Sequence, residues 1–200
     1  MGRVHINDRP GHNPSRPRHH ELHGDPARFS HHGRHHYGHY VTVLPPYYVH
    51  RVYHGRDYYY WNDVWYRYYA GRYWVCRPPF GYVFTPLADA VLAAIVYNSL
   101  TAETEEVRTV EAKSLNLIRN YAAAGTEYFY NDGVFFVRGE DGQYVVIVPP
   151  AGAMVDALPE DFEEFEFDGN TYYKVDDTVY RMTVSEEGKA CFEVLGQLAD

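Results

Sequence analysis

The stretch Asp57-Tyr-Tyr-Tyr-Trp-Asn-Asp-Val-Trp-Tyr-Arg67 consists of two aromatic runs joined by Asn62-Asp63. Aromatic and β-branched residues favour strands, because large side chains pack well on a pleated surface. Asn and Asp tolerate the positive φ angles that a tight two-residue turn requires. The stretch therefore predicts an antiparallel β-hairpin.

Two later parts of the chain resemble this stretch. Residues 158–181 align without a gap with residues 44–67, and the two share Leu-Pro, Gly, Tyr-Tyr, Asp and Tyr-Arg at matching positions. Residues 125–136 match the second half of the same frame, with Asp132-Gly133 at the turn. Repetition of this kind predicts a fold built of similar hairpin units.

The aligned positions also predict which side chains face the core. Tyr59 and Trp65 recur as aromatic or apolar residues, so we expect both to face inward. Lys174 occupies the position of Tyr60, which indicates that this face of the hairpin is exposed to solvent. We therefore expect Tyr58 and Tyr60 at the surface.

The pattern changes between the first two copies. Apolar residues from Val107 to Tyr121 recur at helical spacing, Thr104 is a suitable first residue and Gly125 a suitable stop. We predict a helix near residues 104–124. A shorter helix is predicted near residues 88–97, although its apolar run is equally compatible with a buried strand.

The fold class that follows is mainly β with a helical insertion (α+β), made of repeated antiparallel β-hairpin units. We expect one β-rich repeat domain at residues 41–200, preceded by a tail at residues 1–40 that is rich in His, Arg, Pro and Gly. The tail has almost no aliphatic residues and cannot offset its ordering entropy by burial, so we expect it to be disordered. The predicted parts are the units at 41–86, 125–157 and 158–195 and the helical insertion at 88–124.

Charge is divided along the chain. The tail has six Arg against three acidic residues, whereas residues 102–200 have 21 acidic against seven basic side chains, a net of −14. An acidic domain of this kind disfavours nucleic acid as a partner. No apolar run follows Met1-Gly2-Arg3 as in a secretory leader, and no stretch reaches the length of a transmembrane segment.

The repeated motifs support a resemblance to a family. Tyr58–Arg67, Tyr128–Gly152 and Leu158–Arg181 resemble an uncharacterised, tyrosine-rich repeat family of exported bacterial envelope proteins, typical of the Bacteroidetes and often bearing His-rich tails. The resemblance covers most of residues 41–195. It implies the repeated fold and a location in the cell envelope or outside the cell, and it implies no activity.

The tail is a candidate metal site. Imidazoles are common ligands of Ni²⁺, Zn²⁺ and Cu²⁺, and several of these histidines are four residues apart. The alternative is a solvated low-complexity spacer with incidental metal affinity. The candidate ligands are His19, His23, His31, His32, His35, His36 and His39.

The exposed aromatic side chains are candidates for binding. Tyr58, Tyr60 and Trp61 could stack on the sugar rings of a cell-wall glycan or on another envelope protein, or they could be cross-strand packing pairs. The sequence has no GxSxG, P-loop or HExxH motif, and Cys76 and Cys191 follow every His in the chain. We therefore expect a non-catalytic envelope or surface protein without a cofactor, and metal binding by the tail is the alternative function.

Overall fold

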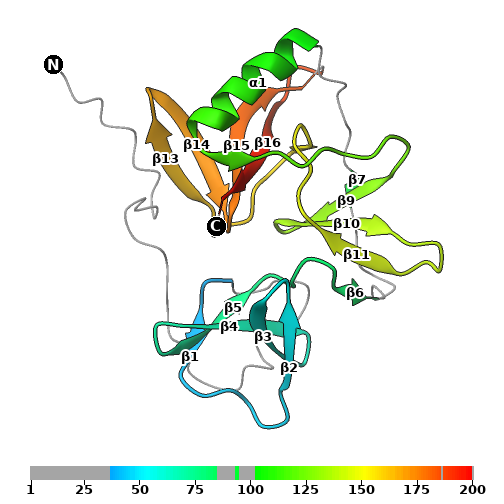
Figure 1. Ribbon diagram of the computed structural model, residues 1–200, viewed down its shortest axis with the longest axis vertical. Helices are drawn as coiled ribbons and strands as arrows, with labels where there is room; N and C mark the ends of the chain where they lie inside the picture. Colours follow the sequence, from blue (N-terminus) through cyan, green and yellow to red (C-terminus); the bar gives the residue numbers. More distant parts are fainter. Residues whose placement is uncertain (1–36, 85–92, 95–101, 186, 200) are drawn as a thin grey trace, which may run out of the picture.

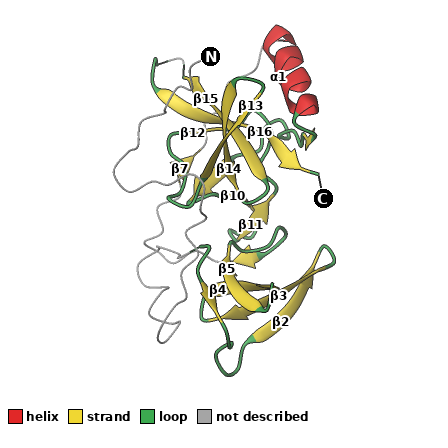
Figure 2. Ribbon diagram, turned by 90° about the vertical axis from the view of Figure 1, so that its left-hand side faces the viewer, coloured by secondary structure: helices red, strands yellow, loops and turns green. Residues whose placement is uncertain are grey.

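A computed structural model of the chain describes residues 37–84, 93–94, 102–185 and 187–199 (Figure 1). The described strands form three antiparallel sheets. The first sheet lies at one end of the molecule and the second and third sheets lie at the other, an arrangement that Figures 1 and 2 both show. Residues 1–36 of the expected tail lie outside the described residues.

The first sheet is made of five strands that follow one another closely in the chain. They are β1 (Tyr40–Val41), β2 (Val49–Tyr53), β3 (Arg56–Trp61), β4 (Val64–Tyr69) and β5 (Arg72–Cys76), in the order β1-β5-β4-β3-β2. Two-residue turns join the last four strands, and all six turn residues have positive φ. These turns are His54-Gly55, Asn62-Asp63 and Ala70-Gly71.

The second sheet contains β6 (Val83–Phe84), β7 (Ala93–Ala94), β9 (Tyr128–Asn131), β10 (Val134–Arg138) and β11 (Tyr144–Ile147), in the order β6-β11-β10-β9-β7. The third contains β12 (Met154–Val155), β13 (Glu163–Phe167), β14 (Asn170–Val175), β15 (Thr178–Val184) and β16 (Ala190–Leu198), in the order β12-β16-β15-β14-β13. Strand β8 (Leu117–Ile118) also pairs with the end of β16. The chain is thus mainly β, as predicted.

All three sheets place their first strand beside their last. A glycine with positive φ stands before each first strand, and its N–H donates to the carbonyl of a buried valine in the last strand at 2.8–3.1 Å. The N–H of the same valine donates back to the residue after the glycine. The glycine–valine pairs are Gly38 with Val75, Gly81 with Val146, and Gly152 with Val194.

The described residues form four apolar clusters in the interior. One lies in the first sheet around Tyr66, and one lies in the second sheet around Phe136. The third cluster surrounds Tyr180 and includes Phe135, so it joins the second and third sheets. The fourth cluster, around Leu195, lies on the side of the third sheet where Leu115 and Leu117 pack.

The predicted helix at 104–124 is only half correct. Helix α1 (Ala102–Ser114) ends where Asn116 adopts a φ of 55°, and Leu117 and Ile118 then pair with β16. Asn is one of the few residues that adopt this left-handed conformation readily, which explains the end of the helix. Val107 and Val110 are 55% and 64% exposed, although their helical spacing had suggested a buried face.

The other corrections concern the ends of predicted segments. For residues 88–97, where the sequence allowed a short helix or a strand, Ala93 and Ala94 form strand β7, paired with β9, and the other residues of that range lie outside the described residues. The predicted tail ended at residue 40, but Tyr37 is buried in the first core and Tyr40 lies in β1. In the part of the chain that the structure describes, no helix is both long and apolar enough to cross a membrane.

Candidate functional site

The first sheet contains most of the aromatic residues singled out in the sequence, and its register sorts them onto two faces. Tyr59 pairs with Tyr66 across β3 and β4, and Tyr60 pairs with Trp65. Directly paired residues share a face and neighbours in sequence lie on opposite faces, so Tyr59 and Trp65 lie on opposite faces. Both side chains pack inward as expected, Tyr59 against the first core and Trp65 with only 5% exposure, but they do so on opposite faces of the sheet.

Trp65 is covered by a cluster of tyrosines, which we call the tryptophan cage. Its members are Tyr53, Tyr58, Tyr60 and Tyr82, with ring centroids 4.8–6.1 Å from that of Trp65. Tyr82 also stacks on Phe84 of the second sheet at 6.0 Å. The cage therefore joins the first and second sheets through aromatic packing.

Two of the predicted binding residues, Tyr58 and Tyr60, belong to this cage. Both are half-buried, and the Tyr60 hydroxyl donates a hydrogen bond to Asp63 at 2.6 Å. Burial, together with the hydrogen bond to Asp63, raises the pKa of Tyr60. The third residue, Trp61, packs against the first core on the opposite face. The structure therefore does not bring the three predicted residues together on one surface.

A different set of rings forms a continuous row on the face of Tyr59. The distances between ring centroids are 4.8 Å for Tyr68 and Tyr73 and 5.2 Å for Tyr73 and Tyr59. The Tyr59 ring in turn lies 5.7 Å from that of Tyr48 and 5.1 Å from that of His50. We call these five residues the aromatic strip. Tyr68 is 55% exposed and Tyr48 45% exposed, whereas Tyr59 and Tyr73 are half-buried. The two inner rings, Tyr59 and Tyr73, pack against the first core, and the outer rings Tyr68 and Tyr48 are the accessible ends of the row.

The turns of the first sheet determine which rings meet in the aromatic strip. Two-residue turns at 54–55, 62–63 and 70–71 dictate the register, and this register pairs Tyr68 with Tyr73 and Tyr59 with His50. Sequence reasoning missed the strip because it judged exposure by alignment with Lys174. In this sheet only the turn at Asn62-Asp63 was predicted. The pairs that form the strip depend on the turns at 54–55 and 70–71, which were not predicted from the sequence.

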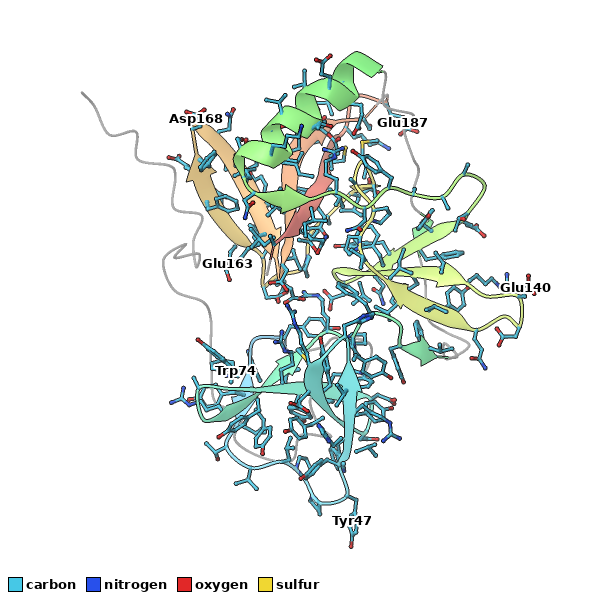
Figure 3. All side chains as sticks on the ribbon, viewed as in Figure 1. Tyr47, Trp74, Glu140, Glu163, Asp168 and Glu187 are labelled. Atoms are coloured by element: carbon cyan, nitrogen blue, oxygen red, sulfur yellow. The ribbon has the colours of Figure 1, made fainter. Side chains whose placement is uncertain are left out.

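Further polar and aromatic groups surround the strip. Residues 37–84 contain five Arg against two Asp, in contrast to the acidic remainder of the domain. The His50 ring is hydrogen-bonded to Asp57, with 2.6 Å between Nε2 and Oδ1, and the Arg72 guanidinium carbon lies 4.3 Å from the Tyr40 ring centroid. Tyr47, 94% exposed, projects from the loop at the far end of the sheet (Figure 3). The first sheet thus combines accessible rings with positive charge.

Arg77 joins this sheet to the other two. Its guanidinium contacts both carboxylate oxygens of Asp161, at 2.6 and 3.1 Å, and one of Asp176 at 3.0 Å. Its Nε donates to the Asp132 carbonyl in the second sheet, and its plane covers the Tyr37 ring at 4.2 Å. The carboxylates hold the pKa of Arg77 above its usual value despite burial. Its role is therefore structural: it is a charged junction of three sheets.

Helix α1 docks on the third sheet mainly through charged groups. Arg108 Nε donates to both carboxylate oxygens of the buried Glu193, at 3.2 and 2.9 Å. Glu111 accepts hydrogen bonds from Tyr172 and Arg181, both at 2.9 Å. These contacts explain why the valines of the helix point outward.

The metal-site prediction finds no counterpart within the described ranges. No group of three or more His, Cys, Asp and Glu there could hold a metal ion. Of the seven predicted ligands, His39 is described; its backbone carbonyl accepts from Val75, as part of the fold. The other six predicted ligands, His19, His23, His31, His32, His35 and His36, lie outside the described residues.

The two cysteines are free and lie in strands β5 and β16. Burial is the main cause that raises the pKa of both thiols. A raised pKa lowers the fraction of the nucleophilic thiolate at neutral pH, so neither cysteine has the environment of an activated nucleophile.

Comparison with known protein families matches part of the chain. Residues 107–197 match the Family of unknown function (DUF6515), which covers the end of α1, the described part of the second sheet from β9 onward and nearly all of the third sheet. The aromatic strip lies outside the matched region. No curated protein and no solved structure matches the chain.

Proposed function

We propose that the chain is a non-catalytic protein of the bacterial cell envelope or surface, which binds a cell-wall glycan or another envelope protein through the aromatic strip. The observation that supports this proposal is the row of contacting rings from Tyr68 to Tyr48, of which the two outer rings are about half exposed. Tyrosine rings stack on the apolar faces of sugars, and aromatic side chains are enriched in protein interfaces.

The proposal includes the repeated nature of the domain. The shared strand order and the three matching glycine–valine hydrogen-bond pairs support an origin of the three sheets from one repeated unit. Such a repeated scaffold would hold the strip rigidly. A rigid row of rings loses little conformational entropy on binding, which favours recognition of an extended ligand.

A pull-down on insoluble peptidoglycan tests the strip. We expect Tyr68→Ala to reduce binding about tenfold, equivalent to about 1.4 kcal/mol. The matched control is Tyr69→Ala, because Tyr69 is the next residue of the same strand, is 74% exposed, and lies on the opposite face. Both variants should remain folded, since both side chains are at the surface.

Equal retention of the wild type, Tyr68→Ala and Tyr69→Ala on peptidoglycan would contradict glycan binding by the strip. The same three proteins, used as bait for envelope extracts, distinguish a protein partner. Selective loss of a single band with Tyr68→Ala would identify the strip as a protein interface.

The alternative proposal is metal binding by the tail, favoured by the eight histidines from His19 to His39, seven of which are the candidate ligands. Equilibrium dialysis against Zn²⁺ or Ni²⁺ should show excess metal in the full chain and none in a variant lacking residues 1–36. Equal metal content in the two proteins would contradict this function. The same deletion should leave binding by the strip unchanged.

A further inference from the structure

The open edges of the sheets differ in length. Of the seven edge strands in the described sheets, β1, β6, β7, β8 and β12 have two residues each, whereas β2 and β13 have five. A strand at the edge of a sheet has backbone N–H and C=O groups on its outer side that can pair with another strand. Very short edges offer little for such pairing, so β2 and β13 are the two edges able to accept a partner strand.

The two long edges have opposite charge. β2 has Arg51, and its histidine, His50, is hydrogen-bonded to Asp57. β13 has three glutamates, of which Glu163 is paired with Lys174 at 3.0 Å, and Asp168 follows it directly. Figure 3 shows Glu163 and Asp168 at the two ends of this strand.

The edges also have exposed apolar side chains. Val52 of β2 is 61% exposed, Val49 is 37% exposed, and Phe167 of β13 is 40% exposed. Neither strand contains the proline or the bulge that commonly protects an edge. Charge is therefore the feature that decides which strands can pair with them.

We infer that β2 of one copy of the chain pairs with β13 of a second copy, so that molecules join head to tail. Like charges directly opposite one another destabilise a pair of strands, so the glutamates of β13 disfavour pairing of β13 with itself. Pairing of β2 with β13 instead places Arg51 against the carboxylates. The complementary charges thus select a second copy of this chain as the partner.

The geometry of this contact leads to open assembly. β2 and β13 belong to different sheets and lie on opposite sides of the molecule in Figure 1. A contact between two different surfaces leaves one edge free at each end, and further copies can add unless a ring closes. A repeated envelope protein joined in this way would form filaments or rings whose aromatic strips stand at regular intervals.

Sedimentation velocity of the full chain at low salt tests the inference. We expect assembly that increases with protein concentration and decreases with salt. Arg51→Glu should weaken assembly about tenfold, because it replaces attraction with repulsion opposite the carboxylates. A second variant, Glu164→Lys with Glu166→Lys, should weaken it in the same way. Arg138→Glu and Glu140→Lys are matched controls in the second sheet, away from both edges.

The mixture of the two edge variants is the decisive measurement. Each variant alone should assemble about tenfold more weakly than the wild type, yet the mixture should assemble as the wild type does, because each variant's β2 is complementary to the other's β13. A wild type that stays monomeric up to its solubility limit would overturn the inference. So would assembly that is unaffected by both edge variants but lost on deletion of residues 1–36, since that result would assign association to the tail.

Discussion

The first and third sheets have the same strand order but are covered in different ways. Tyr66 and Tyr180 occupy corresponding positions, each paired with a tyrosine of the preceding strand, and both have no solvent exposure. The third sheet is covered by helix α1 and by the second sheet, and Arg77 contacts it from the end of the first. The first sheet instead leaves a row of rings accessible. The difference shows that one strand pattern can form a sheet that is covered on both sides or a sheet that leaves rings accessible to solvent.

The largest predicted effect tests whether the two cores are equivalent. Tyr66→Ala and Tyr180→Ala each remove a fully buried ring, so each should lower the free energy of unfolding by about 4 kcal/mol. Urea unfolding followed by circular dichroism measures both. A cost for Tyr66→Ala well below that for Tyr180→Ala would show that the first sheet is not an independent copy of the third.

The next effect concerns the junction between the sheets. Arg77→Met removes the cation that joins Asp161, Asp176 and the Asp132 carbonyl, and we expect a loss of about 3 kcal/mol. Unfolding should then separate into two transitions, because the first sheet loses its charged link to the others. Arg138→Met is the control at an exposed site and should change stability by less than about 0.5 kcal/mol. A single transition with unchanged midpoint would contradict the role of Arg77.

Weakening the contact between helix α1 and the third sheet should lower the free energy of unfolding by a smaller amount, and the effect should be confined to that sheet. Arg108→Met leaves the buried Glu193 without its closest cation and should cost about 2 kcal/mol. Hydrogen exchange should become faster in α1 and β16 and stay unchanged in β3 and β4. Faster exchange throughout the chain would show that the two regions unfold together.

High pH should act on the third sheet through Tyr172. Burial, with the hydrogen bond to Glu111, raises the pKa of Tyr172 to about 12, so folding favours the protonated phenol. Its contribution to stability is complete below pH of about 10, the unfolded pKa, and is lost as pH rises to about 12. Tyr172→Phe should lose about 1 kcal/mol at neutral pH and should show a shallower decline between pH 10 and 12. Parallel pH profiles for the two proteins would contradict this assignment.

The smallest predicted effect is on the strip. Tyr68→Ala should change the free energy of unfolding by no more than about 0.5 kcal/mol, because its ring is 55% exposed. The same urea titration measures it beside Tyr66→Ala, two residues earlier in the same strand. A cost above about 2 kcal/mol would show that the strip is part of the core.

Much of the local structure was predictable from residue types. Asn62-Asp63 and Asp132-Gly133 lie at turns because these residues tolerate positive φ. The helix was predicted too long because apolar spacing from Val107 to Tyr121 resembled a buried face, whereas α1 docks through Arg108 and Glu111. A helix that packs through charged side chains shows no periodic pattern of apolar residues, so the sequence could not reveal how α1 packs on the third sheet.

The candidate site was predictable only in part. Tyr58 and Tyr60 were identified as surface aromatics, but Tyr82, which is 22 residues beyond Tyr60, covers Trp65 beside them. Tyr68 and Tyr73 were not identified, although the Ala70-Gly71 turn between them determines that they pair.

The sequence by itself determined the turns, the strands and the register within each hairpin, because these depend on φ preferences and on residues a few positions apart. Only the tertiary structure decided which faces are covered. The partners of Arg77 lie 55 to 99 residues further along the chain, and Glu111 meets Arg181 70 residues away. Contacts at such separations arise from the packing of whole sheets, so local sequence patterns do not predict them.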